Sequence, residues 1–304
     1  MEIWREKSQE CPDCFLPTTI GILDAEIFGN SLFDPHGFWL AFDEERAVGF
    51  VHASFAPAIE GNRPDFRAGI IFSPIIRPSS EGKMETVQQL IDRAERYIKE
   101  KNATGAFAGG YDKDAPFYTG LYSHCNPNGI FEHDTLIIDA FRNRGYSLFN
   151  TSTELRLNPA EYHVPENMAE LCLCYQVFRV RQFKSTNWWD ANLYRNFRSQ
   201  EWNLIPRNGE KAIAGAVVHE MMTDPVGERV NDPYYTLAYI GVLNEYLRHH
   251  VGSFLLVNLI DGLRQSRDIY SIVTQDEEHL RRFLEYHSFQ QVERQLTFLK
   301  FFYG

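Results

Sequence analysis

Apolar and polar residues first form a clear pattern at residues 38–51. Residues 38–42 and 47–51 are rich in aromatic and branched apolar side chains, and the four residues between them, 43–46, are all charged. Two short apolar runs separated by a polar turn are typical of a pair of neighbouring strands. The pattern therefore predicts a hairpin at this point of the chain.

The same pattern returns in the second half of the chain. A polar turn at 207–211 precedes a strand at 213–217, and Gly215 takes the place that Gly49 has 166 residues earlier. Similarity at a constant offset is the mark of an internal repeat. We therefore predict that the two halves share one order of elements.

A longer strand and a helix follow in each half. Residues 69–78 and 235–243 are the predicted strands, and Pro78 and Asn244 at their ends are again 166 residues apart. The helices are predicted from apolar residues that recur at helical spacing. These are Met84, Val87, Leu90, Ile91, Ala94 and Ile98 in the first half, and Val251, Phe254, Leu255, Leu259 and Leu263 in the second.

A last helix and strand close each half, around residues 136–146 and 280–289. The offset falls to 143 residues here, so the first half holds 23 additional residues, around 112–134. This segment is rich in Pro, Gly, Asn and aromatic residues, which predicts a long loop. Loops of that length inside compact domains are often functional.

The chain is predicted to divide into two domains. Residues 158–167 contain two prolines and separate the repeats, which gives domains at 1–160 and 168–304. Each domain combines strands and helices as a mixed α/β (α+β) fold, with a central mixed sheet flanked by helices.

Composition narrows the classes of function. The 304 residues are 44% hydrophobic and 23% charged, which excludes a mostly disordered or fibrous chain. The formal net charge of −11 makes nucleic acid a poor partner. No apolar run approaches the ~20 residues that span a bilayer, and the first residues have no signal-peptide pattern, so we expect no membrane partner and a cytosolic location.

Cysteine spacing offers one candidate metal site. Cys11 and Cys14 form a C-x-x-C pair, and Cys172 and Cys174 form a C-x-C pair, which together could supply four thiolates to zinc. The tight spacing of the second pair favours reduced, partly buried thiols instead. We therefore expect no metal.

The element order resembles that of the GNAT superfamily of acyl-coenzyme A-dependent N-acyltransferases. The stretch Val242-Leu-Asn-Glu-Tyr-Leu-Arg-His-His-Val-Gly-Ser-Phe-Leu-Leu256 is similar to the family's cofactor motif, Val-x-Pro, then Gln/Arg-x-x-Gly-x-Gly/Ala and an apolar helix. Leu247 stands at the Gln/Arg position, His250 at the first Gly and Gly252 at the second. Two such units look like the tandem arrangement of double-domain acetyltransferases similar to mycothiol synthase.

The motif has a physical reason that does not depend on the family. A helix start presents unpaired N–H groups and the positive end of its dipole, and so stabilises a diphosphate. The alternative is an ordinary strand–turn–helix, but basic residues at a helix start then lack a reason. By resemblance the preceding strand carries the pantetheine arm. The candidate residues for acetyl-coenzyme A are Ile240, Val242, Arg248, His249, His250, Val251, Gly252 and Ser253.

The first half departs from the motif. Glu81, Met84 and Thr86 stand where Gln/Arg, Gly and Gly/Ala are expected. Glu81 and Glu85 would repel a diphosphate, and acidic residues suit an ordinary helix start. We therefore predict that the first half has lost cofactor binding.

The resemblance implies direct attack of an amine on a thioester, which needs a base for the amine proton. Family members often use a Tyr as the acid for the departing thiolate, but Leu284 and Phe141 occupy that position in the two halves. Tyr286 lies about 200° further around the helix and is predicted to be a surface residue. Glu277 stands where the family often has an Asn that touches the cofactor.

The candidate catalytic residues lie near the ends of the second-half strands. His219 and Glu220 follow the strand 213–217, and Tyr239 lies on the next strand. The alternatives are a solvated His and a core Tyr. In the long loop, Tyr118, Tyr122 and His124 either line an acceptor pocket or pack the loop on itself.

These expectations give two functions. The first is an N-acetyltransferase that passes the acetyl group of acetyl-coenzyme A to a small-molecule amine or an N-terminal amine. The second is a non-catalytic sensor or scaffold that binds acyl-coenzyme A, which the absent Tyr favours. The sequence leaves open whether the chain forms a homodimer.

Overall fold

The computed structural model describes residues 1–80, 82–111, 114–165, 168, 170–180, 185, 187–221 and 233–302. In the first half the elements are α1 (Glu2–Glu10), α2 (Ile20–Leu23), β1 (Phe38–Asp43), β2 (Arg46–Pro57), β3 (Pro64–Ile71), β4 (Ile75–Ile76), α3 (Lys83–Glu100), β5 (Gly105–Ala108), β6 (Ile130–Phe131), α4 (Thr135–Asn143) and β7 (Ser147–Leu157). In the second half they are α5 (Leu171–Cys174), β8 (Tyr175–Val180), α6 (Trp188–Leu193), β9 (Arg198–Pro206), β10 (Ala214–Met221), β11 (Tyr234–Val242), α7 (Val251–Gly262), β12 (Ile269–Thr274), α8 (Glu278–Tyr286) and β13 (Gln290–Phe301).

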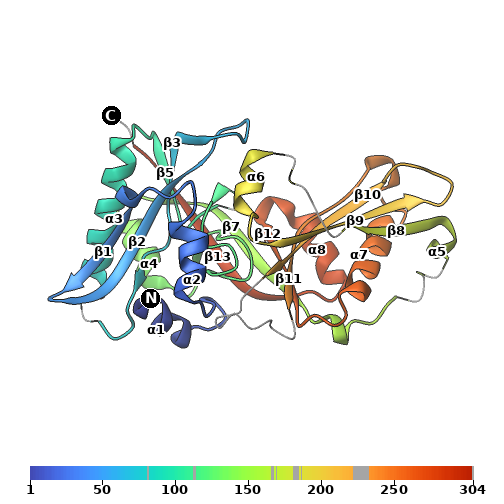
Figure 1. Cartoon of the computed structure of the whole chain (residues 1–304), viewed down its shortest axis with the longest axis horizontal. Coiled ribbons are helices and arrows are strands. Elements are labelled where there is room, and N and C mark those ends of the chain that lie inside the picture. Colours follow the sequence, from blue (N-terminus) through green and yellow to red (C-terminus); the bar gives the residue numbers. More distant parts are fainter. Residues whose placement is uncertain are drawn as a thin grey trace.

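One mixed sheet runs through both halves. Its order is β1-β2-β3-β5-β13-β7-β12-β11-β10-β9-β8, with β4 beside β2 and β6 beside β13. Figure 1 shows the first half at the left and the second half at the right, joined by the strands β7 and β13. The predicted mixed fold with two repeated units is therefore confirmed.

The final strands of the two halves are exchanged. β13, the end of the second half, pairs with β5 of the first half, for example at Phe298 and Ala108. β7, the end of the first half, pairs with β12 of the second half, for example at Leu155 and Ser271. β7 and β13 pair with each other in the middle. Each half therefore completes its sheet with a strand from the other.

One predicted strand is divided in two. The run 69–78 forms β3 and the short β4, which turns back to pair with β2 at Gly49 and Ile76. Pro74 lies in the break, and a proline has no N–H to give to a sheet ladder. The corresponding strand of the second half, β11, continues to Val242.

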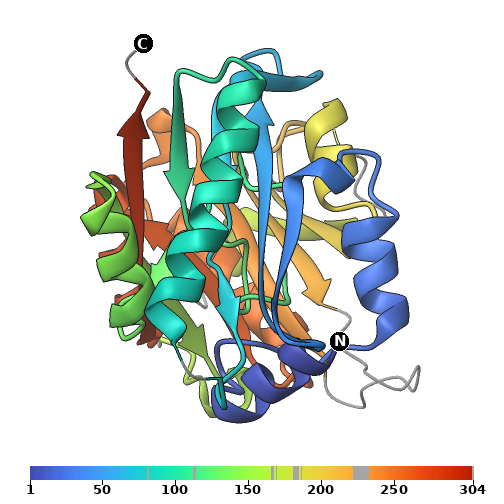
Figure 2. The same cartoon turned by 90° about the vertical axis from the view of Figure 1, so that its left-hand side faces the viewer.

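The helices cover the sheet through the predicted apolar stripes. The stripe of α3 is buried against the first-half strands together with α4, and α7 and α8 bury their apolar residues on the second half. A separate aromatic cluster, which includes Trp4 and Phe15, packs α1 and the long loop on the other face. In Figure 2 the teal helix α3 lies in front of the strands and the blue α2 lies at their right-hand side. Among the described helices, none is both long and apolar enough to cross a bilayer.

Candidate functional site

The strands β11 and β12 separate at the centre of the second half. They are parallel and pair only at Tyr235 with Ile269 and at Thr236 with Tyr270. Beyond that point β12 stays with β7, and β11 stays with β10. The corresponding strands of the first half, β3 and β5, pair at four positions, from Ala68 to Ile71. The second half alone therefore opens a wide gap between its parallel strands.

A β-bulge lies on β11 at the edge of this gap. Val217 of β10 pairs with Tyr239 and Val218 pairs with Leu237, which leaves Ala238 without a partner in the register. The pairing with β12 has already ended at Thr236. Ala238 is therefore the extra residue of the bulge, and it has no register partner on either β10 or β12.

The gap continues into a cleft of about 640 Å³, open solvent at its mouth included. Its walls come from β10, β11, β12 and the start of α8, and Ala238 lies among its lining residues. The long loop of the first half closes one side with Cys125, Asn126 and Asn128. The cleft is therefore built by both halves of the chain.

His219 lines the cleft from β10. The imidazole is buried, with Nδ1 2.7 Å from Ser199 Oγ, and its ring stacks on Tyr194 with 3.9 Å between centroids. Burial lowers the pKa of His219 to about 4, so the ring is neutral at pH 7. Asn126 donates a 3.0 Å hydrogen bond to the Tyr194 hydroxyl. The sequence did not predict Tyr194 or Asn126 as neighbours of His219, because only the fold brings these three residues together.

The other two catalytic candidates lie apart from each other. Glu220 follows His219 directly, so its side chain points to the opposite face of β10. There it accepts a 3.3 Å hydrogen bond from the Tyr235 hydroxyl and lies 3.8 Å from Arg198. Tyr239 lines the cleft with 59% of its surface exposed, and its hydroxyl lies where a Cβ atom at Gly241 would clash.

The start of α7 is open, as the motif predicted. His250 is the N-cap residue in a left-handed conformation, φ 57°, and no side chain caps the helix. The first helical hydrogen bond joins Phe254 N to His250 O at 2.9 Å. Within the described residues, the amides of Val251, Gly252 and Ser253 have no hydrogen-bond partner. The predicted basic residues Arg248, His249 and His250 directly precede these amides in the chain and are exposed.

Two contacts fix this helix start beside β11. A Cβ at Gly252 would lie 3.2 Å from Val242 Cγ2, so the helix approaches the strand end closely. The Ser253 hydroxyl lies 2.9 Å from His287 Nε2, and Tyr162 Oη lies 2.8 Å from His287 Nδ1. Ile240 and Val242 lie on the strand between the helix start and the cleft, and both are half-buried. The strand β11 thus leads from the cleft, at Ile240, to Val242 beside the open start of α7.

The loop residues predicted for the acceptor pocket lie elsewhere. Tyr118 stacks on Trp4 and Tyr122 packs edge-on against Phe15, and both tyrosines are buried in the first-half aromatic cluster. Neither tyrosine lines the cleft, and both pack the loop against aromatic neighbours, which is the second of the two alternatives from the sequence.

His124 lies closer to the cleft but does not line it. It pairs with the buried Glu154, with 2.9 Å between Nδ1 and Oε1, and its ring stacks on Tyr270. Its carbonyl accepts a 2.6 Å hydrogen bond from Thr236 Oγ1. His124 therefore attaches the loop to β11, and the next residues, Cys125 and Asn126, reach the cleft.

The two positions at which the resemblance led us to expect a Tyr acid hold buried apolar residues instead. Leu284 and Phe141 are completely buried in the two hydrophobic cores, and Tyr286 is 68% exposed, as predicted. Glu277 accepts hydrogen bonds from the backbone N and the hydroxyl of Thr274, at 3.0 and 2.8 Å. It lies on the cleft wall between β12 and α8.

In the first half, the corresponding strands stay paired, and the place holds only a smaller cavity, lined by residues that include His52, Phe72 and Gly109. Gly109 N donates a 2.8 Å hydrogen bond to Ile71 O, which extends the pairing of β3 and β5. His52 packs there against Phe72 and Phe117. The start of α3 has Gly82 as its N-cap, and the predicted Glu81 lies outside the described residues.

Comparison with known proteins supports this architecture. No family model matches the chain, and no curated protein matches it. Among solved structures, a tandem GNAT protein from the clavulanic acid biosynthesis pathway aligns with a TM-score of 0.59 at 12% identity, over 87% of this chain and 82% of its own. A GCN5-related N-acetyltransferase from Sphaerobacter thermophilus aligns with a TM-score of 0.57 at 10% identity, over 88% and 81%.

A third similar structure is the GCN5-related glucosamine N-acetyltransferase region of a fungal multi-domain beta-N-acetylglucosaminidase. It has a TM-score of 0.61 at 16% identity, over 92% of this chain and 36% of the other. At these identities the likeness shows the fold. The chain therefore has the tandem GNAT fold that the sequence predicted.

Proposed function

We propose that this chain, with its tandem GNAT fold, is an N-acyltransferase whose second half binds acetyl-coenzyme A and transfers the acetyl group to an amine. The similar structures are N-acetyltransferases by name, which supports acyl transfer in general. One observation of this chain carries the proposal further. The uncapped start of α7 adjoins the end of the bulged, splayed strand β11, and the residues of β11 before that end line the cleft.

The residues of α7, β11 and the cleft fit the three parts of acetyl-coenzyme A. The open amides of Val251, Gly252 and Ser253 suit a diphosphate, and the dipole of α7 favours negative charge there. The backbone at Ile240 and Val242 suits the amides of a pantetheine arm, because β11 has lost its partner on that side. When bound, the group supplies a thioester whose carbonyl carbon an amine can attack.

The chain's own groups would then assist the transfer. The N–H of Ala238 stabilises negative charge that develops on the carbonyl oxygen, since Ala238 is the extra residue of the bulge and has no register partner on β10 or β12. In the tautomer whose Nδ1–H donates to Ser199 Oγ, the neutral ring of His219 accepts the amine proton at Nε2, directly or through water. Tyr239 offers a second hydroxyl at the cleft for proton exchange with the departing sulfur.

The acceptor would enter beside the long loop. Asn126 and Tyr194 present an amide and a hydroxyl next to His219, which suits a small polar amine or an N-terminal amine. The net charge of −11 favours cationic amines over anionic ones. Glu220 lies on the opposite face of β10 from His219 and has no role in this transfer. The identity of the acceptor, the cytosolic location and formation of a homodimer stay predictions.

The first half would have a structural role without cofactor. Its parallel strands remain paired where those of the second half separate, and aromatic side chains occupy the corresponding space. Its domain, predicted as residues 1–160, would support the second-half site by supplying the long loop and the strand β7.

A second function is favoured by one specific observation. Leu284 and Phe141, at the positions of the usual Tyr acid, are completely buried apolar residues. A chain that binds acyl-coenzyme A at α7 without releasing it would act as a sensor or scaffold.

The test separates binding from turnover. Calorimetry with coenzyme A measures binding to the full chain, and thiol release from acetyl-coenzyme A with a panel of amines measures transfer. We expect Arg248→Glu to weaken coenzyme A binding by about 10-fold at low salt, because a carboxylate then faces the diphosphate. Arg264→Glu, at the other end of α7, is the matched control and should bind as the wild type does.

Each outcome decides between the candidates. Binding with thiol release supports the transferase, and binding without release for any amine supports the sensor. No binding, or equal binding by the Arg248 variant at low salt, contradicts the placement of the diphosphate at α7.

A further inference from the structure

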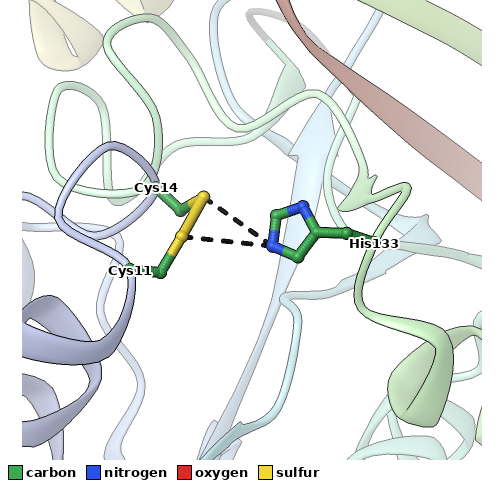
Figure 3. A group of neighbouring side chains, drawn as sticks. All are labelled: Cys11, Cys14 and His133. Carbon is green, nitrogen blue, oxygen red and sulfur yellow. Dashed lines mark hydrogen bonds between the residues drawn. A yellow bond between two sulfur atoms is a disulfide. The ribbon is translucent and has the colours of Figure 1, made fainter.

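A cluster of metal-ligating side chains lies outside the cleft. Cys11, Cys14 and His133 bring two sulfurs and one ring nitrogen together, and their ligand atoms all lie within 4.8 Å of one another. Figure 3 shows the two sulfur atoms facing the imidazole ring from one side. His133 Nε2 lies 4.0 Å from Cys11 Sγ and 3.8 Å from Cys14 Sγ.

The local backbone holds both cysteines at the end of α1. Cys14 N and Phe15 N both donate to Cys11 O, at 3.1 and 3.0 Å, which forms a tight turn. Phe15 is buried in the aromatic cluster, so the turn is attached to the body of the first half. The two sulfurs are joined as a disulfide in this structure. Reduction would leave two thiols on a turn that already directs them toward one histidine.

The histidine is oriented from behind by a carboxylate. His133 Nδ1 lies 3.1 Å from Glu293 Oε2, which favours the proton on Nδ1 and leaves the Nε2 lone pair facing the sulfurs. A carboxylate behind the coordinating ring is the usual outer partner of a metal-bound histidine. The turn that carries His133 is itself fixed to β13, because Glu132 and Arg294 exchange a backbone and a side-chain bond.

We propose that the reduced chain binds one Zn²⁺ through the thiolates of Cys11 and Cys14 and through His133 Nε2. Two thiolates and one imidazole are a donor set that selects zinc over calcium or magnesium. For tetrahedral zinc, with bonds of about 2.3 Å to sulfur and about 2.0 Å to nitrogen, the bound S and N atoms lie about 3.5 Å apart. The observed 3.8 and 4.0 Å are close to that value. Water takes the fourth position.

The zinc site forms from the disulfide in two steps. A phosphine and one water convert the disulfide into two thiols, and the phosphine becomes the phosphine oxide. Zn²⁺ then replaces the two thiol protons, which are released. The disulfide and the zinc site exclude each other, because each needs both sulfurs.

The proposed site joins three segments that are distant in the sequence. It attaches the end of α1 to the turn after β6, and through Glu293 to β13. The half-exposed His133, with 53% of its side chain open to solvent, gives the ion a path of entry. A bound ion would therefore stabilise the folded first half. The sequence led us to expect no metal, and the described cluster differs from the disfavoured four-thiolate arrangement, since it contains neither Cys172 nor Cys174, which are both exposed.

The test uses the full chain, reduced with a phosphine and freed of it under nitrogen. We expect one Zn²⁺ per chain after gel filtration, with a dissociation constant below about 1 μM. Co²⁺ in its place should give the visible absorption of tetrahedral, thiolate-bound cobalt. Zn²⁺ should also raise the unfolding temperature of the reduced chain.

Variants identify the ligands. The double variant Cys11→Ser/Cys14→Ser should lose the ion and the cobalt spectrum, and Cys172→Ser/Cys174→Ser is the matched control that should keep both. Glu293→Gln retains all three ligands and should weaken zinc binding by about 10- to 100-fold. A reduced wild-type chain that binds no zinc overturns the proposal. Binding that disappears in the control variant, or stays unchanged in Glu293→Gln, also overturns it.

Discussion

Three buried histidines show how position changes the chemistry of one residue type. Burial lowers the pKa of His52 to about 3 and the pKa values of His219 and His287 to about 4. Each ring is therefore neutral at pH 7, although the reasons for burial differ. His219 faces the cleft and His287 orients Ser253, whereas His52 is surrounded by aromatic rings.

His52 is the one of these three whose ring nitrogens both lack a hydrogen-bond partner. Its unfolded pKa lies above its folded pKa, so the unfolded chain binds more protons between about pH 3 and 6.5. The free energy of unfolding therefore falls as the pH falls through that window, and the effect is absent above it.

We expect His52→Phe to raise the free energy of unfolding at pH 7.5 by about 1 kcal/mol, because an unpaired polar group leaves an apolar site. The loss of stability between pH 6.5 and 5 should also become smaller. Urea unfolding at several pH values measures both effects. His279→Phe, at an exposed position of α8, is the control and should keep the wild-type pH dependence. A less stable His52→Phe at pH 7.5 would contradict this account.

At the scale of elements, the bulge and splay of β11 underlie the proposed site for a thioester. A strand that is paired with neighbours on both sides uses its N–H groups in hydrogen bonds to those neighbours. The parallel strands β3 and β5 of the first half keep such pairing. The bulge removes Ala238 from such pairing without ending the strand, which continues to Val242. The proposed oxyanion donor is therefore a property of the strand and not of a side chain.

Ala238→Pro tests this donor, since proline has no N–H and a bulged residue has no ladder bond to lose. We expect kcat to fall by about 100-fold or more, with coenzyme A binding changed only a few-fold. Ala238→Gly keeps the N–H and should retain most of the activity. Steady-state thiol release and calorimetry give the two quantities. Full activity in the proline variant would exclude this N–H as the donor.

For the whole molecule, the exchange of β7 and β13 makes each half depend on the other. The first half lacks an interior neighbour for β5 without β13, and β12 lacks one without β7. An exposed sheet edge in place of a buried pairing is costly and favours aggregation.

We therefore expect fragments 1–163 and 168–304 to be unfolded or aggregated when made alone. Produced together, they should form a 1:1 complex with the circular dichroism spectrum of the intact chain. Size-exclusion chromatography with light scattering measures the stoichiometry. A cooperative thermal transition in either fragment alone would show that the exchange is not needed for folding.

The sequence by itself determined the repeat, the apolar helices and the tandem fold. The repeat and the helices follow from local periodicity, which each segment carries in its own residues, and the tandem fold follows from the resemblance of the element order and of the motif at 242–256 to the GNAT superfamily. The same holds for the open start of α7, because the basic turn before Val251 offers no capping side chain. The surface position of Tyr286 also followed from helix geometry alone.

Only the tertiary structure decided which segments meet. The strand exchange, the placement of Asn126 and Tyr194 beside His219, and the partnership of Cys11 and Cys14 with His133 all join residues far apart in the chain. Tyr118 and Tyr122 are buried for the same reason, since a loop with both polar and aromatic residues can turn either set inward. Local patterns carry no information about such contacts, because the free energy that selects them comes from packing the whole sheet.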